Sequence, residues 1–246
     1  QAEYAEHTIP EGEDLCSVCV PETELPGIPE DALVIIGGNY LTNGDYLTNA
    51  GEIVTEKPEG GYAYVIVGDD QATLVLHNFT FTYTGTQSMI RLNPDVESWT
   101  IELQGNNELT AISDEQDVFS VGLDLFYNRV GLAGDGSLTV NADVGILMNS
   151  VFLASFDPVS LTLNTTQDAI LMNDTLFAAQ NLTLNIISEN SDGIDAMYSD
   201  ILFLSNCMVS ITADDDGIVL NEGQLCVNEK SELNRLEKPL CARDKY

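Results

Sequence analysis

A short motif that returns at a constant interval of 24 residues is the feature that most limits the possible folds of this chain. A small residue followed by isoleucine occurs at this spacing, with the small residue at Gly145, Ala169, Gly193 and Gly217. A regular period of this length is typical of proteins in which each repeat is one structural unit that packs on the next. The fold must therefore be one that short units build by stacking.

The segments between these motifs indicate which kind of unit is stacked. Short stretches such as SLTV, LTLN and VSIT alternate apolar and polar residues, and Asn, Asp and Gly separate them. An alternation with a period of two is typical of β-strands, and no helical period of useful length precedes residue 229. The LxxLxLxxN consensus of leucine-rich repeats is also absent. The sequence therefore predicts an all-β fold, a parallel β-helix built from short strands.

The predicted boundaries of this β-helix follow from composition. Residues 1–30 are rich in Glu and Pro and are predicted to form an N-terminal arm or linker. About eight coils would then fill residues 31–228, beginning with the apolar segment ALVIIGG. Residues 229–246 are predicted to cap the C-terminal end, where strand edges would otherwise be exposed. In this segment KSELNRLEKP predicts a short helix with Ser231 as its N-cap and Pro239 as its stop.

The charge of the chain narrows the classes of partner. It has 40 acidic residues against 8 basic ones, and five of the basic ones lie after residue 228. Such a surface repels nucleic acid and anionic membranes, whereas it suits cations, basic partners or an extracellular life. No run of 18 apolar residues is present, so no transmembrane segment is expected.

The five cysteines do not settle the redox compartment. Cys16 and Cys19 have the spacing of a redox or half-zinc motif, but no second CxxC follows them. A local disulfide in the arm and free thiols are the simpler interpretations, and the sequence leaves the pairing of all five cysteines open.

The repeated segments resemble a known family. GSLTVNADVGI, LTLNTTQDAI, LTLNIISENSDGI and VSITADDDGI are similar to the DGI coils of bacterial cell-surface carbohydrate-binding β-helix proteins, over about residues 40–225. The resemblance implies a right-handed parallel β-helix like that of pectate lyases, calcium sites built by aspartates of the DGI turns, and binding of plant-type polysaccharides, including acidic ones. Only the third and fourth copies are complete here, because Val144 replaces the first Asp and Ala169 the second Gly.

Stacking the repeats brings acidic side chains together. Asp168, Asp192 and Asp216 fall in one column, about 5 Å apart from coil to coil, where two charges repel by about 1 kcal/mol even in water. Calcium takes six to eight oxygen ligands, so it is the cation that such a corner is expected to hold. The candidate ligands are Asp168, Asp192, Asp195, Asp214, Asp215, Asp216 and Asn190. The alternatives are a solvated cluster, raised pKa values, or aspartates that only shape turns.

The expected function is carbohydrate binding without catalysis, by a secreted or cell-surface protein and with the assistance of calcium. Tyr198 is the candidate stacking residue, since it is the tyrosine nearest in sequence to the complete DGI copies. A polysaccharide lyase is the first alternative, but no Lys or Arg lies between Arg129 and Lys230 to act as its base. A surface adhesin or structural spacer that binds a protein is the second, and an outward apolar stripe at Leu147, Leu171 and Val219 supports it.

Overall fold

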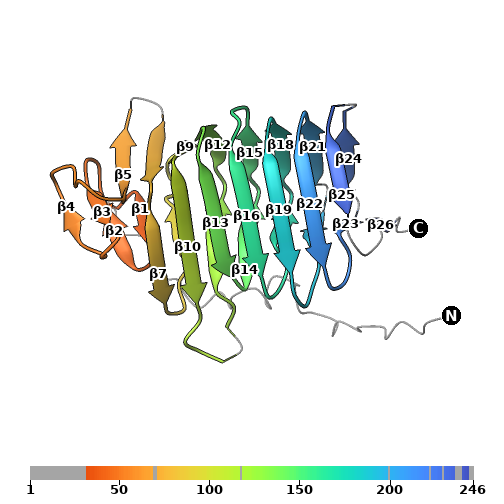
Figure 1. Cartoon of the computed structure of the whole chain (residues 1–246), viewed down its shortest axis with the longest axis horizontal. Coiled ribbons are helices and arrows are strands. Elements are labelled where there is room, and N and C mark those ends of the chain that lie inside the picture. Colours follow the sequence, from red (N-terminus) through yellow and green to blue (C-terminus); the bar gives the residue numbers. More distant parts are fainter. Residues whose placement is uncertain are drawn as a thin grey trace.

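The computed structural model describes residues 32–68, 71–116, 118–198, 200–221, 223–228, 230–235 and 240–243. Within these ranges the chain forms strands and turns and contains no helix, so none could cross a lipid bilayer. The strands make three sheets that run the length of the molecule, and Figure 1 shows the coils following one another along a solenoid. The predicted parallel β-helix is confirmed. The proposed boundary at residue 31 and the arm with Cys16 and Cys19 lie outside the described residues.

The three sheets are named here A, B and C. Sheet A has the order β2 (Asn39–Leu41), β1 (Val34–Ile36), β8 (Ile90–Leu92), β11 (Val121–Phe126), β14 (Val144–Asn149), β17 (Ile170–Asn173), β20 (Ile194–Ala196), β23 (Ile218–Asn221) and β26 (Leu240–Arg243). Sheet B has the order β24 (Gln224–Val227), β21 (Ile201–Ser205), β18 (Leu176–Gln180), β15 (Phe152–Ser155), β12 (Arg129–Gly134), β9 (Ser98–Gln104), β6 (Ala72–His77), β5 (Tyr62–Val67), β3 (Tyr46–Thr48) and β4 (Ile53–Val54). Sheet C has the order β25 (Glu232–Arg235), β22 (Met208–Ala213), β19 (Thr183–Ser188), β16 (Ser160–Thr165), β13 (Ser137–Ala142), β10 (Asn106–Ile112) and β7 (Thr80–Thr84).

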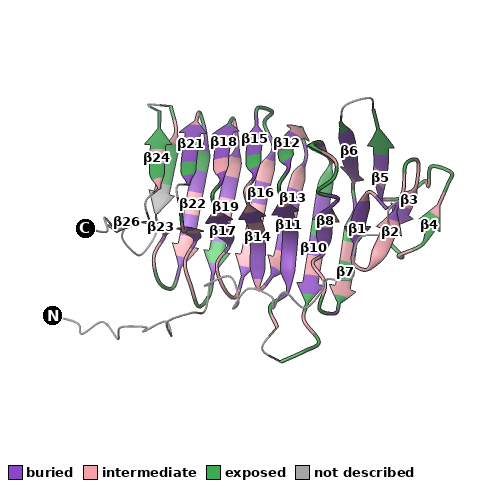
Figure 2. Cartoon of the chain, turned by 180° about the vertical axis from the view of Figure 1, so that it is seen from behind, coloured by how far each residue is buried: buried purple, intermediate pink, exposed green. Residues whose placement is uncertain are grey.

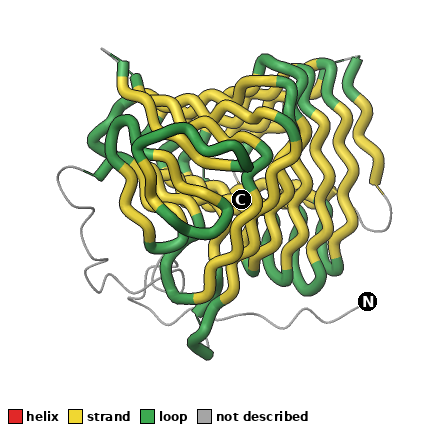
Figure 3. The backbone as a smooth tube through the Cα atoms, turned by 60° about the vertical axis from the view of Figure 1, so that its left-hand side comes forward, coloured by secondary structure: helices red, strands yellow, loops and turns green. Residues whose placement is uncertain are grey.

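Each coil consists of one strand from sheet B, one from sheet C and one from sheet A. Seven such triplets follow one another, from β6, β7 and β8 to β24, β25 and β26, where about eight coils were expected. Figure 3 shows the loops of successive coils stacked in rows at the corners. Equivalent turn residues of neighbouring coils therefore lie side by side, which is what turns a sequence repeat into a row of like side chains.

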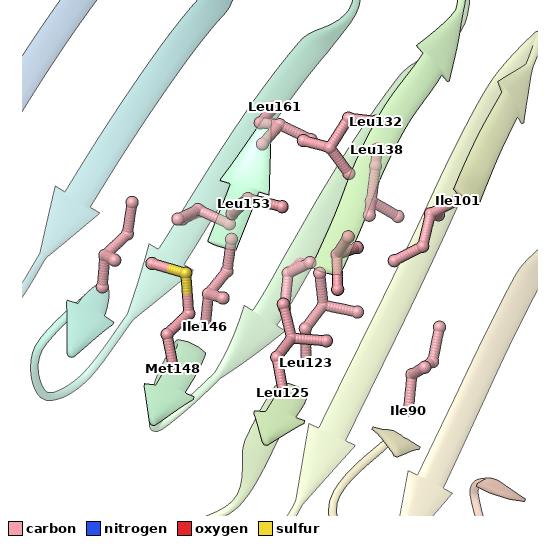
Figure 4. Close-up of a cluster of buried hydrophobic side chains, with 14 of the residues drawn as sticks. Ile90, Ile101, Leu123, Leu125, Leu132, Leu138, Ile146, Met148, Leu153 and Leu161 are labelled. Atoms are coloured by element: carbon pink, nitrogen blue, oxygen red, sulfur yellow. The ribbon is translucent and has the colours of Figure 1, made fainter. Parts of the chain in front are cut away.

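The core runs along the axis between the three sheets. The alternating apolar residues of each strand point inward and are buried, as Ile101, Leu132 and Leu153 illustrate on three successive strands of sheet B. Figure 4 shows these side chains meeting inward-pointing residues of sheets A and C, such as Ile146 and Leu161. Burial of this continuous apolar column is the main favourable term in the stability of the fold.

The first strands depart from the predicted coils. Strand β1, which contains part of the ALVIIGG segment, pairs antiparallel with both β2 and β8, and β3, β4 and β5 also pair antiparallel. Gly37 and Gly38 cause the first reversal, because both have positive φ angles (50° and 76°) and form the two-residue loop of a hairpin. The N-terminal end of the solenoid is therefore covered by antiparallel strands.

The predicted C-terminal helix is wrong. The KSELNRLEKP segment contains strand β25, which pairs parallel with β22 so that Leu233 stands opposite Val209. Strand β26 likewise pairs parallel with β23. An isolated helix of this length is marginal in water, whereas a strand gains a full row of hydrogen bonds from the exposed edge of β22. Pairing with the sheet therefore outweighs the helical cap at Ser231.

Close packing of the backbone explains the glycine of the repeat. A Cβ atom built on Gly193 would lie 2.5 Å from the carbonyl oxygen of Gly217 and would also collide with the side chain of Ile211. We therefore expect Gly193→Ala to lower the free energy of unfolding by about 1–3 kcal/mol, as overpacking of a core does. Urea unfolding measures this change. Gly60→Ala is the matched control, since a Cβ there meets no atom within 4 Å, and equal midpoints for the two variants would contradict the expectation.

Candidate functional site

Acidic residues of the regular coils gather at the corners of the solenoid. Between Ser137 and Asn221, the sheet positions hold Asp195 alone, on β20, and the remaining acidic residues occupy turns. These turn residues are Asp143, Asp157, Asp168, Asp174, Glu189, Asp192, Asp200, Asp214, Asp215 and Asp216. Seven of them lie in the four turns that lead from sheet C to sheet A, and the last of these turns alone holds three. This corner is the most acidic part of the described coils.

The aspartates that precede the small residue of the repeat tie one coil to the next. The Oδ1 atom of Asp168 accepts hydrogen bonds from the backbone N–H of Asp192 (3.0 Å) and from the hydroxyl of Ser191 (2.5 Å). In the same way, Oδ1 of Asp192 accepts the N–H of Asp216 at 2.7 Å. The structure thus places Asp168, Asp192 and Asp216 in one column. One carboxylate oxygen of Asp168 and one of Asp192 each accept a hydrogen bond from the backbone of the following coil.

Asp143 begins this row, although it precedes its glycine, Gly145, by two residues instead of one. Its carboxylate accepts hydrogen bonds from the N–H and the hydroxyl of Ser120, each at 2.9 Å, and from the hydroxyl of Thr166. Burial by itself would raise the pKa of Asp143, but these bonds outweigh it and lower the pKa. The one-residue offset hid this carboxylate from the sequence comparison of the repeats.

Three carboxylates at the end of the row converge on one point. One carboxylate oxygen from each of Asp192, Asp215 and Asp216 lies within 4.8 Å of the other two. Asp215 is exposed, whereas Asp192 and Asp216 are half-buried. Among the residues that the structure describes, this is the only cluster of three or more His, Cys, Asp or Glu side chains whose ligand atoms lie this close. Carboxylate oxygens this close to one another could hold one metal ion between them.

The electrostatics of the cluster are unfavourable in the absence of a cation. Burial raises the pKa of Asp192 to about 6, the negative charges of Asp168, Asp215 and Asp216 act in the same direction, and the hydrogen bond from the N–H of Asp216 acts against them. A carboxyl group with such a pKa is held ionised at neutral pH against a free-energy cost. A divalent cation bound between the carboxylates would remove that cost.

The other predicted ligands lie outside the cluster of three. Asp195 is half-buried on β20, on the outward face of sheet A between Leu171 and Val219. Asp214 is exposed one residue before the cluster, and the amide of Asn190 donates to the carbonyl of Thr166 at 3.0 Å. The sequence therefore located the corner, but which carboxylates converge depends on the path of the turn between β22 and β23.

Tyr198 is separated from this corner. Strand β20 lies between the two, and Tyr198 follows it at the corner where sheet A leads to sheet B. The side chain of Tyr198 is 42% exposed, and its N–H donates to Oδ2 of the buried Asp200 at 3.0 Å. The acidic cluster lies before β20 and Tyr198 lies after it, so a sugar stacked on Tyr198 would be separated from the cluster by the length of that strand. This separation weakens the expectation that Tyr198 and the cluster bind one ligand.

The outward apolar stripe of sheet A is not an exposed surface. Leu171 is 8% exposed and Val219 4%, and Leu171 packs in a small cluster with Val121 and Val144. Leu147 is half-buried, so the stripe leaves little free contact surface for a protein partner. This is the feature on which the alternative of an adhesin or spacer rested.

Arg91 and Arg129 lie far from the acidic cluster, whereas Arg235 on β25 pairs with Ile211 on β22, the strand that leads into the turn of the cluster. Arg91 is on β8, four strands before β20 in sheet A, and its Nε atom is 3.8 Å from Oδ2 of Asp124. Arg129 begins β12 and pairs with Glu97 at 3.5 Å on the surface. Four strand spacings amount to about 19 Å, so the Arg91 guanidinium does not reach a substrate held at the cluster, and Arg129 belongs to a different sheet.

Comparison with family models, with curated proteins and with solved structures finds no match for this chain. The geometry of its own residues must therefore carry a functional assignment. Besides the acidic cluster, the structure reveals exposed aromatic side chains on sheet B, among them Phe152 and Phe203, which were not predicted from the sequence. The alternation of those strands showed that half of their residues face outward but not which half.

Proposed function

We propose that this protein is a secreted or cell-surface carbohydrate-binding solenoid that acts without catalysis and holds calcium at the corner between sheets C and A. The observation that carries the proposal is the convergence of the carboxylates of Asp192, Asp215 and Asp216 within 4.8 Å. The family resemblance of the DGI turns supports the same assignment. These three carboxylates would be the ligands that the protein supplies to the ion.

The ligand set favours calcium over the other common metals. The cluster offers carboxylate oxygens and contains no imidazole or thiolate, which zinc and copper prefer. Calcium accepts irregular shells of six to eight oxygens, whereas magnesium requires a near-ideal octahedron and retains its water. An open corner with three carboxylates suits the more adaptable ion, and water or a ligand would complete its shell.

A cation at this corner would allow an acidic chain to bind an acidic polysaccharide. The chain carries a formal charge of −32, so a polyuronate is repelled unless a cation stands between the two. Because the carboxylate of Asp215 is exposed, an ion bound beside it remains accessible to a uronate carboxylate. We therefore assign calcium a bridging role in addition to its effect on stability.

The lyase alternative is less well supported. Cleavage by elimination needs a base that removes the α-proton next to the uronate carboxylate. Arg91 and Arg129 lie on strands far from the cluster, and each lies near an acidic side chain. Arg235 is the described basic residue whose strand, β25, pairs beside the strand that leads into the cluster. We therefore propose binding without cleavage and keep the lyase as the alternative.

Retention on an immobilised polyuronate tests this proposal. With calcium present, we expect the wild-type chain to be retained with an affinity at least about tenfold above that in chelator, which corresponds to about 1.4 kcal/mol. Asp216→Asn should remove the difference, because it removes one carboxylate from the cluster. Asp143→Asn is the matched control, since Asp143 is not part of the cluster and accepts hydrogen bonds from Ser120 and Thr166 instead. Equal retention with calcium and with chelator would refute the bridging role.

A further inference from the structure

An exposed apolar strip crosses the outward face of sheet B. Phe152, Leu176 and Ile201 stand opposite one another on β15, β18 and β21, and Ala154, Ala178 and Phe203 form the next row. Phe152, Ile201 and Phe203 are 39%, 36% and 43% exposed, and Phe156, after β15, is 63% exposed. Figure 2 colours exposed positions on these strands green. Neighbouring exposed apolar side chains on a strongly acidic protein make this face a candidate contact site.

The strip carries no charged side chain on β15, β18 or β21. The nearest charge in its rows is at Arg129, which precedes Phe152 in the register, and the residues after Ile201 and Phe203 are Gln224 and Cys226. In coils that place most of their acidic residues at corners, these three strands carry no charge on this face. Its occupant is therefore neither a strongly charged peptide nor an anionic lipid surface.

Aromatic side chains are presented to solvent along the strip. Ala154 and Ala178 stand side by side in the row that continues to Phe203; Ala178 is half-buried, whereas Ala154 is buried. On the strand and turn of Ala154, the next outward positions are Phe152 and Phe156, two residues away on either side, and both are exposed. The exposed rings of Phe152, Phe156 and Phe203 are available to stack against the apolar face of a pyranose ring.

A polar cavity adjoins the strip at the C-terminal ends of β18 and β21. It has a volume of about 440 Å³ and is lined by Gln180, Asn181, Ser205, Asn206, Asn228 and Lys230. Ser205 faces the same side of β21 as Phe203, two residues earlier, and Gln180 faces the same side of β18 as Ala178. The amide of Asn181 also donates to the carbonyl of Phe156 at 2.9 Å. The cavity and the aromatic strip are therefore neighbouring parts of one surface.

The amides of the cavity are held in place by each other. Asn206 donates to Oδ1 of Asn181 at 2.6 Å, and Asn228 donates to the hydroxyl of Ser205 at 2.5 Å. Asn181 and Asn206 both have positive φ angles (60° and 53°), which asparagine tolerates better than most residues. Gln180 and Lys230 also line this space. Fixed amides beside further donors and acceptors are suited to sugar hydroxyls.

We propose that this strip and cavity bind a glycan, with separate pyranose rings against Phe156 and Phe203 and hydroxyl groups in the amide-lined cavity. The inference rests on the proposed function only for the class of ligand, because the surface is distinct from the acidic corner and needs no calcium. A second copy of the chain is a poorer occupant, since each copy carries a charge of −32 and two copies repel each other.

The test is the binding of soluble oligosaccharides in the presence of chelator, measured by titration calorimetry. Neutral gluco-oligosaccharides and oligo-uronates form separate arms, and they distinguish a ligand recognised by hydroxyls alone from one whose carboxylate also contacts Lys230. We expect the wild-type chain to bind in at least one arm, and Phe203→Ala to weaken binding about tenfold. Gln180→Ala should weaken it as well. Ile187→Ala is the matched control, since Ile187 is 48% exposed on sheet C, away from the strip.

Two results would overturn the inference. One is the absence of oligosaccharide binding in chelator by folded wild-type chain. The other is binding that Phe203→Ala and Gln180→Ala leave unchanged. Sedimentation of the same samples covers the protein alternative, because self-association that Phe203→Ala abolishes would assign the strip to a contact between copies instead. Asp216→Asn separates this inference from the proposed function, since it should abolish calcium-dependent retention on polyuronate and leave binding in chelator intact.

Discussion

Calcium added to the chelated protein at neutral pH should raise its melting temperature by about 5–10 °C. A ligand at one hundred times its dissociation constant stabilises the folded state by about 2.7 kcal/mol, and each kcal/mol shifts the melting temperature of a chain of this size by about 2–4 °C. Asp192→Asn should abolish the shift, because it removes a carboxylate from the cluster with Asp215 and Asp216. Differential scanning calorimetry measures both effects.

The same substitution should stabilise the metal-free protein. The amide oxygen that Asp192→Asn introduces can still accept the N–H of Asp216, so the substitution keeps that hydrogen bond and removes only the charge. Since the carboxyl is half-exposed and screened by solvent, we expect a gain of about 1 kcal/mol at neutral pH. Asp143→Asn should behave oppositely: it loses charge-assisted hydrogen bonds, destabilises the chain, and leaves the calcium shift in place. A calcium shift that survives in Asp192→Asn would contradict the assignment.

The stability that Asp192→Asn gains in the metal-free chain should depend on pH, and the direction of this dependence follows from the pKa of Asp192. The pKa of Asp192 is about 6 in the folded chain, whereas its reference value is 3.8. Between these two pH values the folded state therefore binds more protons than the unfolded state. The contribution of Asp192 to the stability of the metal-free chain is therefore greatest below about pH 4 and is lost as the pH rises through about 6. The stability difference between Asp192→Asn and wild type should grow over that interval. A constant difference would contradict the raised pKa.

Removing a large inward side chain of sheet B should cost more stability than any surface change. Phe177 is fully buried and stands between Leu153 and Leu202 on the neighbouring strands. We expect Phe177→Ala to lower the free energy of unfolding by about 3–5 kcal/mol, since it removes apolar contacts and leaves a cavity in the axial core. Denaturant unfolding followed by circular dichroism measures this loss.

Phe203→Ala is the matched control for that experiment. Phe203 lies one strand away on sheet B but faces outward and is 43% exposed, so its loss should change stability by less than about 0.5 kcal/mol. The pair distinguishes inward from outward phenylalanines within one sheet. If both variants lost equal stability, the outward orientation of the strip on sheet B would be wrong, and with it the proposed glycan surface.

The repeat of 24 residues was sufficient to predict the solenoid. A fixed interval between Gly145, Ala169, Gly193 and Gly217 forces equivalent residues into register, and the close approach of Gly193 to the carbonyl of Gly217 shows why a small residue recurs. The ends were harder, because no repeat extends into them. At the N-terminal end, Gly37 and Gly38 form a hairpin loop, but the apolar run before them was interpreted as the first coil. At the C-terminal end, the short helix predicted from the sequence had no packing partner to stabilise it.

The acidic corner was predictable in part. Periodicity placed Asp168, Asp192 and Asp216 in one column, but the convergence of Asp215 with two of them depends on how the turn before β23 folds. Asp195 was expected at the same corner and lies instead on the strand that follows it. The strip on sheet B was not predictable, because alternation alone does not reveal whether Phe203 or Leu204 faces the core.

Titration of chelated protein with calcium in a calorimeter tests the proposed cation site most directly. We expect saturable binding that Asp192→Asn, Asp215→Asn and Asp216→Asn each weaken and that Asp143→Asn preserves. We also expect release of a proton on binding near pH 6, detected with two buffers of different ionisation enthalpy, because calcium displaces the proton from Asp192. Absence of saturable binding, or binding that none of the three substitutions weakens, would contradict a cation site at this corner.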